Sequence, residues 1–350
     1  MNITSSHFGN FKTQVFRSFS CQTHKQRSDP MTKTVLLLGA TGKIGRHSAA
    51  AFWNAGWRVR EFDRARDDMI EAAKGCDVIV NGMNPPNYHD WAGIIPQITT
   101  QVIAAARASG AMVVIPGNVY NFGHVSDEID QDTPQTPCSR KGSIRVEMER
   151  AYRDSGVQTL ILRAGNFIDP ERNGDVMSML ILSAIKRGRI TTMGDPDAMQ
   201  PYAYLPDWAR AVVSLVEMRD QLGRFEDVPF PGHCFTINEL RARLAAELDR
   251  PLRLSRFPWW AMRLASPVWE LARELREMRY LWDMPHRLSG EKFDRLLPGF
   301  KASDLREVML AGLPPKIHPD QPVPAGAQRG LASGFSGTGP DHAGALDRPV

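Results

Sequence analysis

Cysteine is scarce in this sequence, and metal-binding motifs are missing. The chain has only four cysteines among 350 residues, all widely separated and without C-x-x-C spacing: Cys21, Cys76, Cys138 and Cys234. This usage excludes a disulfide framework and a cysteine zinc site, and it fits a reducing compartment. The histidines form no H-x-x-x-H pair, so we expect no metal centre. A G-x-S-x-G nucleophile elbow is also missing.

Long hydrophobic runs and a strong charge bias are missing as well. No apolar stretch approaches the ~20 residues that span a bilayer. The 43 basic and 39 acidic residues nearly balance, for a net charge of +4, so we expect no nucleic-acid partner. We therefore predict a cytoplasmic protein. Residues 1–30 leave organelle targeting open, because their composition resembles a transit peptide. We favour a disordered extension, or an upstream start codon with Met31 as the true first residue.

The chain is organised around residues 34–64, which read as a nucleotide-binding strand, turn, helix and second strand. Residues 35–38 form an apolar run, typical of a strand buried on both faces of a parallel sheet. Three glycines follow, spaced to permit a tight bend, close approach of a pyrophosphate, and close packing of the helix on the strand. The helix N-terminus then offers free N–H groups to phosphate. The residues of this predicted dinucleotide site are Gly39, Thr41, Gly42, Lys43, Ile44 and Gly45.

An acidic residue ends the second predicted strand. Asp63 lies roughly 20 residues beyond the glycines, where a carboxylate can bind the adenosine ribose hydroxyls and repel a 2′-phosphate. Arg64 could instead stack on adenine or bind that phosphate. We therefore favour NAD and leave NADP open. Asn81 and Gly82, at the end of the third predicted strand, complete the cofactor set.

Strands alternate with helices as far as residue 165, which predicts an α/β fold of the Rossmann type with a doubly wound parallel sheet. We assign residues 31–165 to this dinucleotide-binding domain and residues 166–314 to a smaller C-terminal substrate lobe, from which the chain also returns to the sheet. Such a lobe can close a substrate pocket at the carboxyl ends of the strands. Residues 315–350, rich in Gly, Pro, Ala and Ser, are predicted to be disordered.

Three further motifs resemble those of a known superfamily. Besides GATGKIG, they are GNVYNFG at 117–123, LRAGN at 162–166 and YLPDWAR at 204–210. Together they resemble the extended and atypical short-chain dehydrogenase/reductases, the NAD-dependent epimerase/dehydratase group. The resemblance covers about residues 34–312. It implies NAD(P)-dependent oxidoreductase, epimerase or dehydratase chemistry on a small hydroxyl or carbonyl compound.

The sequence departs from that family at the active site. Members usually carry Tyr-x-x-x-Lys, whereas here Lys141 and Arg145 occupy the two slots. Their spacing of four places both on one helix face. The K-x-x-I-R-x-x-x-E pattern resembles the isoflavone-reductase group, in which the lysine is the proposed acid/base. Burial and the like charge of Arg145 could lower the pKa of Lys141 toward neutrality. The alternative is a solvated lysine and a surface Arg145–Glu149 pair.

Three polar residues follow strands four and five. We expect Asn118 and Asn166 to contact substrate or nicotinamide, against the alternative that each stabilises its own loop. Tyr120 matches a family tyrosine that mainly packs, and it could supply a phenol. We predict a small-molecule substrate and leave a homodimer open. The rival to an enzyme is a non-catalytic dinucleotide-binding sensor or assembly subunit, because the Tyr-x-x-x-Lys pair is missing.

Aromatic residues lie just before the predicted helix 259–279 and at its start. Phe257, Trp259, Trp260 and Trp269, with arginines on the polar side, allow an interfacial membrane helix. Aromatic-rich amphipathic helices more often belong to the core or to a pocket wall, and we favour that interpretation here.

Overall fold

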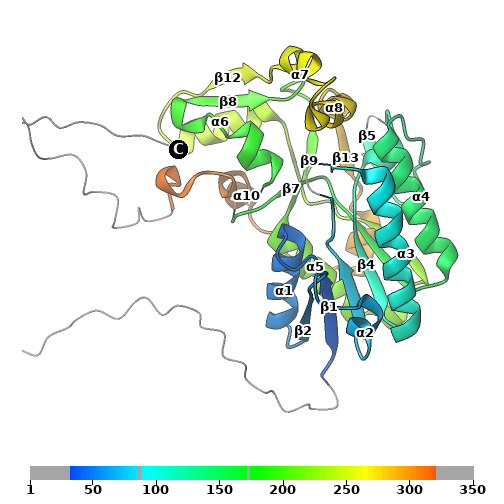
Figure 1. Cartoon of the computed structure of the whole chain (residues 1–350). Helices are drawn as coiled ribbons and strands as arrows, with labels where there is room; N and C mark the ends of the chain where they lie inside the picture. The colour runs from blue at the N-terminus through cyan, green and yellow to red at the C-terminus, as the bar shows by residue number, and fades with distance from the viewer. Residues whose placement is uncertain (1–31, 86–87, 126, 172–173, 321–350) are drawn as a thin grey trace, which may run out of the picture. The chain divides into compact units, whose positions relative to one another are not determined.

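The computed structural model describes residues 32–85, 88–125, 127–171 and 174–320 (Figure 1). The predicted disordered segments, 1–30 and 315–350, lie largely outside these ranges. The start of the predicted disordered segment 315–350 is described, and there Pro315–Ile317 forms a 3-10 helix, η7. None of the described helices combines the length and the hydrophobicity needed to cross a membrane.

A six-stranded parallel sheet occupies the centre of the fold, which confirms the predicted α/β class. In chain order its strands are β1 (Thr34–Leu38), β2 (Arg58–Phe62), β3 (Val78–Asn81), β4 (Met112–Gly117), β6 (Thr159–Arg163) and β10 (Phe225–Pro229). Its helices are α1 (Lys43–Asn54), α2 (Met69–Ala73), α3 (Trp91–Ser109), α4 (Arg140–Ser155) and α5 (Leu205–Glu217).

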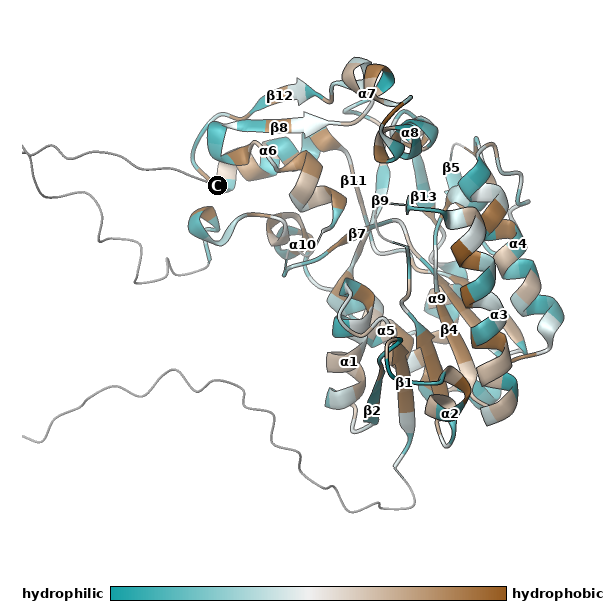
Figure 2. Ribbon diagram, viewed as in Figure 1, coloured by the Kyte–Doolittle hydropathy of each residue, from teal (hydrophilic) through white to brown (hydrophobic). Residues whose placement is uncertain are grey.

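Alternating side chains of the strands form a separate core on each face of the sheet. In β1, Val35 and Leu37 pack in the cluster that contains residues of α1 and α5. Leu36 and Leu38 pack in the cluster that contains residues of α3 and α4. All four side chains are fully buried, as expected of a strand covered on both faces. In Figure 2 the central strands β1 and β4 are accordingly hydrophobic along their length.

The strand order is β2-β1-β3-β4-β6-β10, so β2 is an edge strand and the winding reverses between β1 and β3. Leu38 pairs with Asn81 in register, which brings the carboxyl ends of these two strands together. Open parallel sheets bind ligands at such a reversal, in the crevice beyond the carboxyl ends of the strands. The topology therefore places the glycine turn, which follows β1, at the expected binding position.

Smaller elements make up the rest of the fold. A three-stranded sheet contains β7 (Asn166–Ile168), β9 (Gln200–Tyr204) and β11 (His233–Phe235). Two pairs of parallel strands follow: β8 (Arg189–Thr192) with β12 (Arg253–Arg256), and β5 (Asp127–Ile129) with β13 (His286–Leu288). The helices are α6 (Ile237–Glu247), α7 (Trp259–Ala265), α8 (Glu270–Glu277), α9 (Glu291–Leu296) and α10 (Leu305–Ala311). Single turns complete it: η2 (Tyr120–Phe122), η3 (Met177–Ile181, a π turn), η4 (Ile185–Arg187), η5 (Arg219–Gln221) and η6 (Arg279–Trp282).

One detail differs from the expectation drawn from the sequence. The predicted single helix 259–279 is two helices, α7 and α8, because Pro267 follows Ser266 and interrupts the helical hydrogen bonds. Part of the predicted lobe 166–314 also belongs to the main sheet: β10 is its sixth strand, and α5 covers one of its faces.

Candidate functional site

The glycine turn after β1 has the geometry that its three glycines predict. Gly39 adopts φ +76°, a conformation that other residues rarely take. A Cβ on Gly45 would lie 2.3 Å from the Gly39 carbonyl oxygen and 2.6 Å from Ala40 Cα, so only glycine lets α1 pack this closely on the turn. Gly42 is the N-cap of α1, and its own side-chain position is open apart from Gly39. Among the described residues no side chain caps the N-terminus of α1.

The neighbouring strand contributes to the same crevice. A Cβ on Gly82 would lie 3.1 Å from the Leu38 carbonyl oxygen, so the chain after β3 runs close to the glycine turn. Asn81 is buried, and its side-chain oxygen accepts a hydrogen bond from the Met83 N–H at 3.2 Å. Asn81 therefore stabilises the loop that forms this wall.

The remaining turn residues differ in their environment. Thr41 is exposed, whereas Ile44 is buried in the hydrophobic core under α1. Lys43 Nζ donates to the Gly174 carbonyl oxygen at 2.9 Å. Burial lowers the pKa of Lys43, against the opposing effect of Asp175 and Asp169. The lysine thus links the start of α1 to the segment after β7.

The acidic residue predicted for the ribose lies at the end of the edge strand β2. One carboxylate oxygen of Asp63 accepts the Ala65 N–H at 2.9 Å, and the other lies 3.4 Å from the Arg66 guanidinium. The side chain is about half exposed (52%), and Arg64 is exposed. Both residues are accessible to a ligand.

Lys141 lies in an environment that the sequence analysis did not anticipate. Its Nζ lies 2.7 Å from a Glu277 carboxylate oxygen, makes a second ion pair with Glu274, and donates to the Glu274 carbonyl oxygen at 3.1 Å. The side chain is 1% exposed, and the Tyr88 ring lies 5.1 Å from Nζ. The lysine is therefore buried under α8 and paired with two carboxylates, rather than solvated.

Arg145 is also buried, and among the described ion pairs it does not form the pair with Glu149 that was the alternative from the sequence. Its guanidinium donates to the Pro116 carbonyl oxygen and lies 3.6 Å from the Met148 sulfur. Its Nε has no hydrogen-bond partner among the described residues. Burial lowers the pKa of Arg145, against the opposing charge of Glu149. A buried cation with a free donor at the end of β4 is suited to an anionic or polar ligand.

Glu149 pairs instead with Arg163, so the alternative of a surface Arg145–Glu149 pair is wrong. Arg163 is fully buried and binds Glu149 at 2.8 Å, Asp227 through a second ion pair, and the Asn118 carbonyl oxygen at 2.6 Å. Burial opposes ionisation of Glu149, but the Arg163 guanidinium outweighs it and lowers the pKa of that carboxyl. The sequence analysis assigned Arg163 no role, although it lies in the quoted LRAGN motif. This ion-pair cluster joins β6, α4 and β10.

The three predicted substrate residues lie at the carboxyl ends of β4 and β6. The Asn118 side chain accepts the Tyr120 N–H at 3.0 Å, the turn-stabilising role given as its alternative. Tyr88 and Arg145 both lie close enough to Tyr120 to affect the ionisation of its phenol. Burial and the Tyr88 phenol raise the pKa of Tyr120 well above its usual value, against the charge of Arg145. Asn166 begins β7 and is partly exposed.

One group of potential metal ligands occurs among the described residues: His47, Asp169 and Glu171. His47 Nε2 lies 2.9 Å from Asp169, and the Arg46 guanidinium lies 2.5 Å from Glu171 and 3.8 Å from Asp169. Arg46 already supplies positive charge to these carboxylates, so we read the group as an ion-pair cluster.

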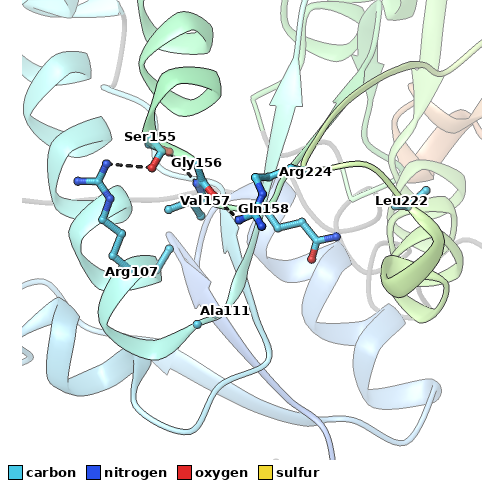
Figure 3. A pocket seen from close by; sticks show the side chains of 10 residues that line it. Arg107, Ala111, Ser155, Gly156, Val157, Gln158, Leu222 and Arg224 are labelled. Carbon is cyan, nitrogen blue, oxygen red and sulfur yellow. Dashed lines mark hydrogen bonds between the residues drawn. The ribbon is translucent and has the colours of Figure 1, made fainter.

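A hollow of about 550 Å³ lies at the opposite edge of the sheet, where β4 and β6 begin (Figure 3). Arg107 donates to the Ser155 carbonyl oxygen and Arg224 to that of Gly156, each at 2.9 Å. Since these polar groups already bind the backbone, we assign no ligand to this hollow.

The glycine turn lies where the strand order reverses, and the helix α4 carries buried charged residues. Together these features define a Rossmann-type nucleotide-binding protein. A sequence model of the NAD-dependent epimerase/dehydratase family matches residues 35–228. The chain therefore belongs to that family, which confirms the resemblance seen in the sequence. A search of curated proteins gave no match.

Solved structures with the same fold share little sequence identity with this chain. MoeE5 in complex with UDP-glucose and NAD is 17% identical, with a TM-score of 0.63 over 80% of this chain and 97% of that one. UDP-glucuronic acid 4-epimerase from Bacillus cereus with NAD is 14% identical, with a TM-score of 0.63 over 79% and 96%. RMD from Pseudomonas aeruginosa complexed with NADPH is 16% identical, with a TM-score of 0.61 over 81% and 98%.

Proposed function

We propose that this protein is an NAD(P)-dependent oxidoreductase or epimerase/dehydratase that acts on a small hydroxyl or carbonyl compound. The observation that carries the proposal is the turn at 39–45, where a Cβ on Gly45 would meet the backbone of Gly39 and Ala40. Such a cradle fits a dinucleotide diphosphate at the first turn of α1. When bound, the nicotinamide would supply hydride transfer.

The cofactor would be held by the turn residues 39–45, with Asn81 and Gly82 forming the adjacent wall. We propose that the exposed Asp63 carboxylate binds the adenosine ribose hydroxyls, which favours NAD over NADP. Arg64 would instead favour NADP, since a guanidinium can bind a 2′-phosphate. Of the three solved structures described above, two hold NAD and one holds NADPH.

Replacing Asp63 should reduce the preference for NAD. We expect Asp63→Ala to raise the dissociation constant for NAD about tenfold or more, because a charged hydrogen bond is lost. The dissociation constant for NADP should rise less or fall, since a negative charge is also removed. Titration calorimetry with both coenzymes measures this. Asp63→Asn keeps the turn contact to Ala65, and Glu61→Ala, on the same strand, is the control. A larger loss of NADP affinity would overturn the assignment.

For proton transfer we propose Lys141, with Arg145 binding an anionic or polar part of the substrate. The Lys141 side chain, which is paired with Glu274 and Glu277, would donate a proton to a substrate oxygen. Because Lys141 is 1% exposed, this role requires α8 to move away from it when substrate binds. Asn118, Tyr120 and Asn166 would line the same end of the sheet and contact substrate or nicotinamide.

One observation favours a second candidate, a non-catalytic dinucleotide-binding sensor or assembly subunit. Lys141 Nζ is already bonded to Glu274 and Glu277, an arrangement that would equally serve to anchor α8 on α4. In that case the protein would bind coenzyme without turning over a substrate.

Two variants of Lys141 separate these roles. Lys141→Arg keeps both ion pairs but cannot release a proton near neutral pH, and Lys141→Met removes both functions. If Lys141 moves the proton, both variants should lower kcat by about 100-fold or more while NAD binding persists. Turnover is followed by the absorbance of reduced nicotinamide on a panel of hydroxyl and carbonyl compounds that includes UDP-sugars.

Lys292 provides a matched control, since its Nζ pairs with Glu226 at 2.7 Å and its side chain is 17% exposed. The Lys292→Met variant should have the same kcat as the parent chain. Full activity of Lys141→Arg would assign the lysine to anchoring α8. Coenzyme binding without turnover of any panel compound would favour the sensor.

A further inference from the structure

Exposed apolar side chains gather on the short helix α7 and on the turn that leads from it to α8. Trp260 is 71% exposed, Leu264 73%, Val268 92% and Trp269 47%. Scattered exposed apolar residues are ordinary, but four within ten residues of one hairpin form a patch. The hydropathy colouring of Figure 2 shows brown segments on α7 beside teal ones. This finding differs from the core or pocket-wall position that we favoured from the sequence.

The orientation of the hairpin is fixed by contacts on its inner side. Trp259 Nε1 donates to the Met193 carbonyl oxygen at 2.5 Å, and its ring packs edge-on against Phe257. Arg276 donates to the Ser266 hydroxyl at 2.7 Å and so ties α8 to the end of α7. Trp260, next in the chain, is therefore held outward.

Charge is segregated across the hairpin. Between residues 253 and 279, all of which the structure describes, every exposed residue is arginine, proline or a large apolar residue. We call these residues the 253–279 face: Arg253, Arg256, Pro258, Trp260, Arg263, Leu264, Pro267, Val268, Trp269, Arg273, Arg276 and Arg279.

The three acids of the same segment, by contrast, are buried or partly buried. Glu274 and Glu277 pair with Lys141, and Glu270, which is partly exposed, binds His89 at 2.8 Å. Asp283, just beyond the segment, lies 4.0 Å from Arg279. The face therefore presents six arginines around an apolar centre, and its acidic counter-charges are largely taken up by residues outside the segment.

We propose that the 253–279 face binds the surface of an anionic lipid bilayer. Tryptophan favours the interface between lipid headgroups and hydrocarbon, and leucine and valine gain free energy from hydrocarbon contact. Arginines around them attract anionic headgroups. A nucleic acid fits less well, because aliphatic side chains such as Leu264 and Val268 offer no surface for base stacking. The membrane contact would be peripheral.

Co-sedimentation of the full chain with vesicles tests this proposal. We expect binding to an equal mixture of phosphatidylcholine and phosphatidylglycerol, little binding to phosphatidylcholine alone, and weaker binding as salt is raised. Trp260→Ala and Arg263→Glu should each lower the partition coefficient about tenfold or more. Both side chains are exposed, so folding should persist, and circular dichroism checks it.

Matched controls lie elsewhere on the surface. Trp53 on α1 is 65% exposed, and the Arg295 side chain on α9 is 64% exposed. Trp53→Ala and Arg295→Glu should bind vesicles like the parent chain. The proposal is overturned by a lack of binding to the anionic vesicles, by equal losses in test and control variants, or by binding to an oligonucleotide instead. A dimer in size-exclusion chromatography that Trp260→Ala dissociates, without vesicle binding, would assign the face to a second copy of this chain.

Discussion

Gly45→Ala is expected to abolish measurable NAD binding and to lower the free energy of unfolding by about 2 kcal/mol. The added methyl group would lie 2.3 Å from the Gly39 carbonyl oxygen and 2.6 Å from Ala40 Cα. Both are backbone atoms of the turn, so the clash cannot be relieved by a side-chain rotation. The turn must move away from α1, and the N–H groups of the helix then no longer converge on a diphosphate.

Gly299→Ala is the control for this substitution. Gly299 has no unusual φ, and an added Cβ there would meet no atom of the described residues within 4 Å. We expect an unchanged melting temperature and unchanged NAD affinity. Titration calorimetry and thermal melting measure both quantities. NAD binding by Gly45→Ala with parental affinity would show that the diphosphate does not lie on this turn.

Arg163→Met is expected to lower the free energy of unfolding by about 3–5 kcal/mol. The substitution removes the only cation bound directly to Glu149 and Asp227 in the described ion-pair cluster, and both carboxylates would remain buried. The same side chain donates to the Asn118 carbonyl oxygen, so the end of β4 should also lose order. Urea denaturation followed by circular dichroism measures the change.

Arg306→Met tests whether burial is the cause. Arg306 also binds two carboxylates, Glu247 at 2.7 Å and Asp320 at 2.8 Å, but its side chain is 39% exposed. Water can solvate the groups left behind, so this variant should melt close to the parent chain. Equal effects of the two substitutions would contradict the account of the Arg163 cluster. Adding Asp227→Leu to Arg163→Met should recover part of the lost stability.

Features encoded by neighbouring residues could be predicted from the sequence. The strand at 35–38, the glycine spacing and the acid at 63 all belong to one continuous segment, whose local geometry follows from residue type. The alternation of strands and helices similarly predicted the parallel sheet. The family motifs then gave the correct family.

Features that depend on distant contacts could not be predicted. Lys141 was expected to feel the like charge of Arg145, whereas its partners Glu274 and Glu277 come from a helix more than 130 residues further along the chain. Glu149 likewise binds Arg163 rather than Arg145, which lies one turn away on the same helix. Helix periodicity shows which residues share a face, but it does not show what that face packs against. The outward position of Trp260 was missed for the same reason.

The account rests on a coenzyme bound at the turn between β1 and α1. Titration calorimetry of the parent chain with NAD, NADH, NADP and NADPH, with Gly45→Ala as the negative control, tests it most directly. We predict a saturable heat for one site per chain with NAD or NADH, and none with the variant. If none of the four coenzymes produces heat with the parent chain, the dinucleotide site and the proposed enzyme are both wrong.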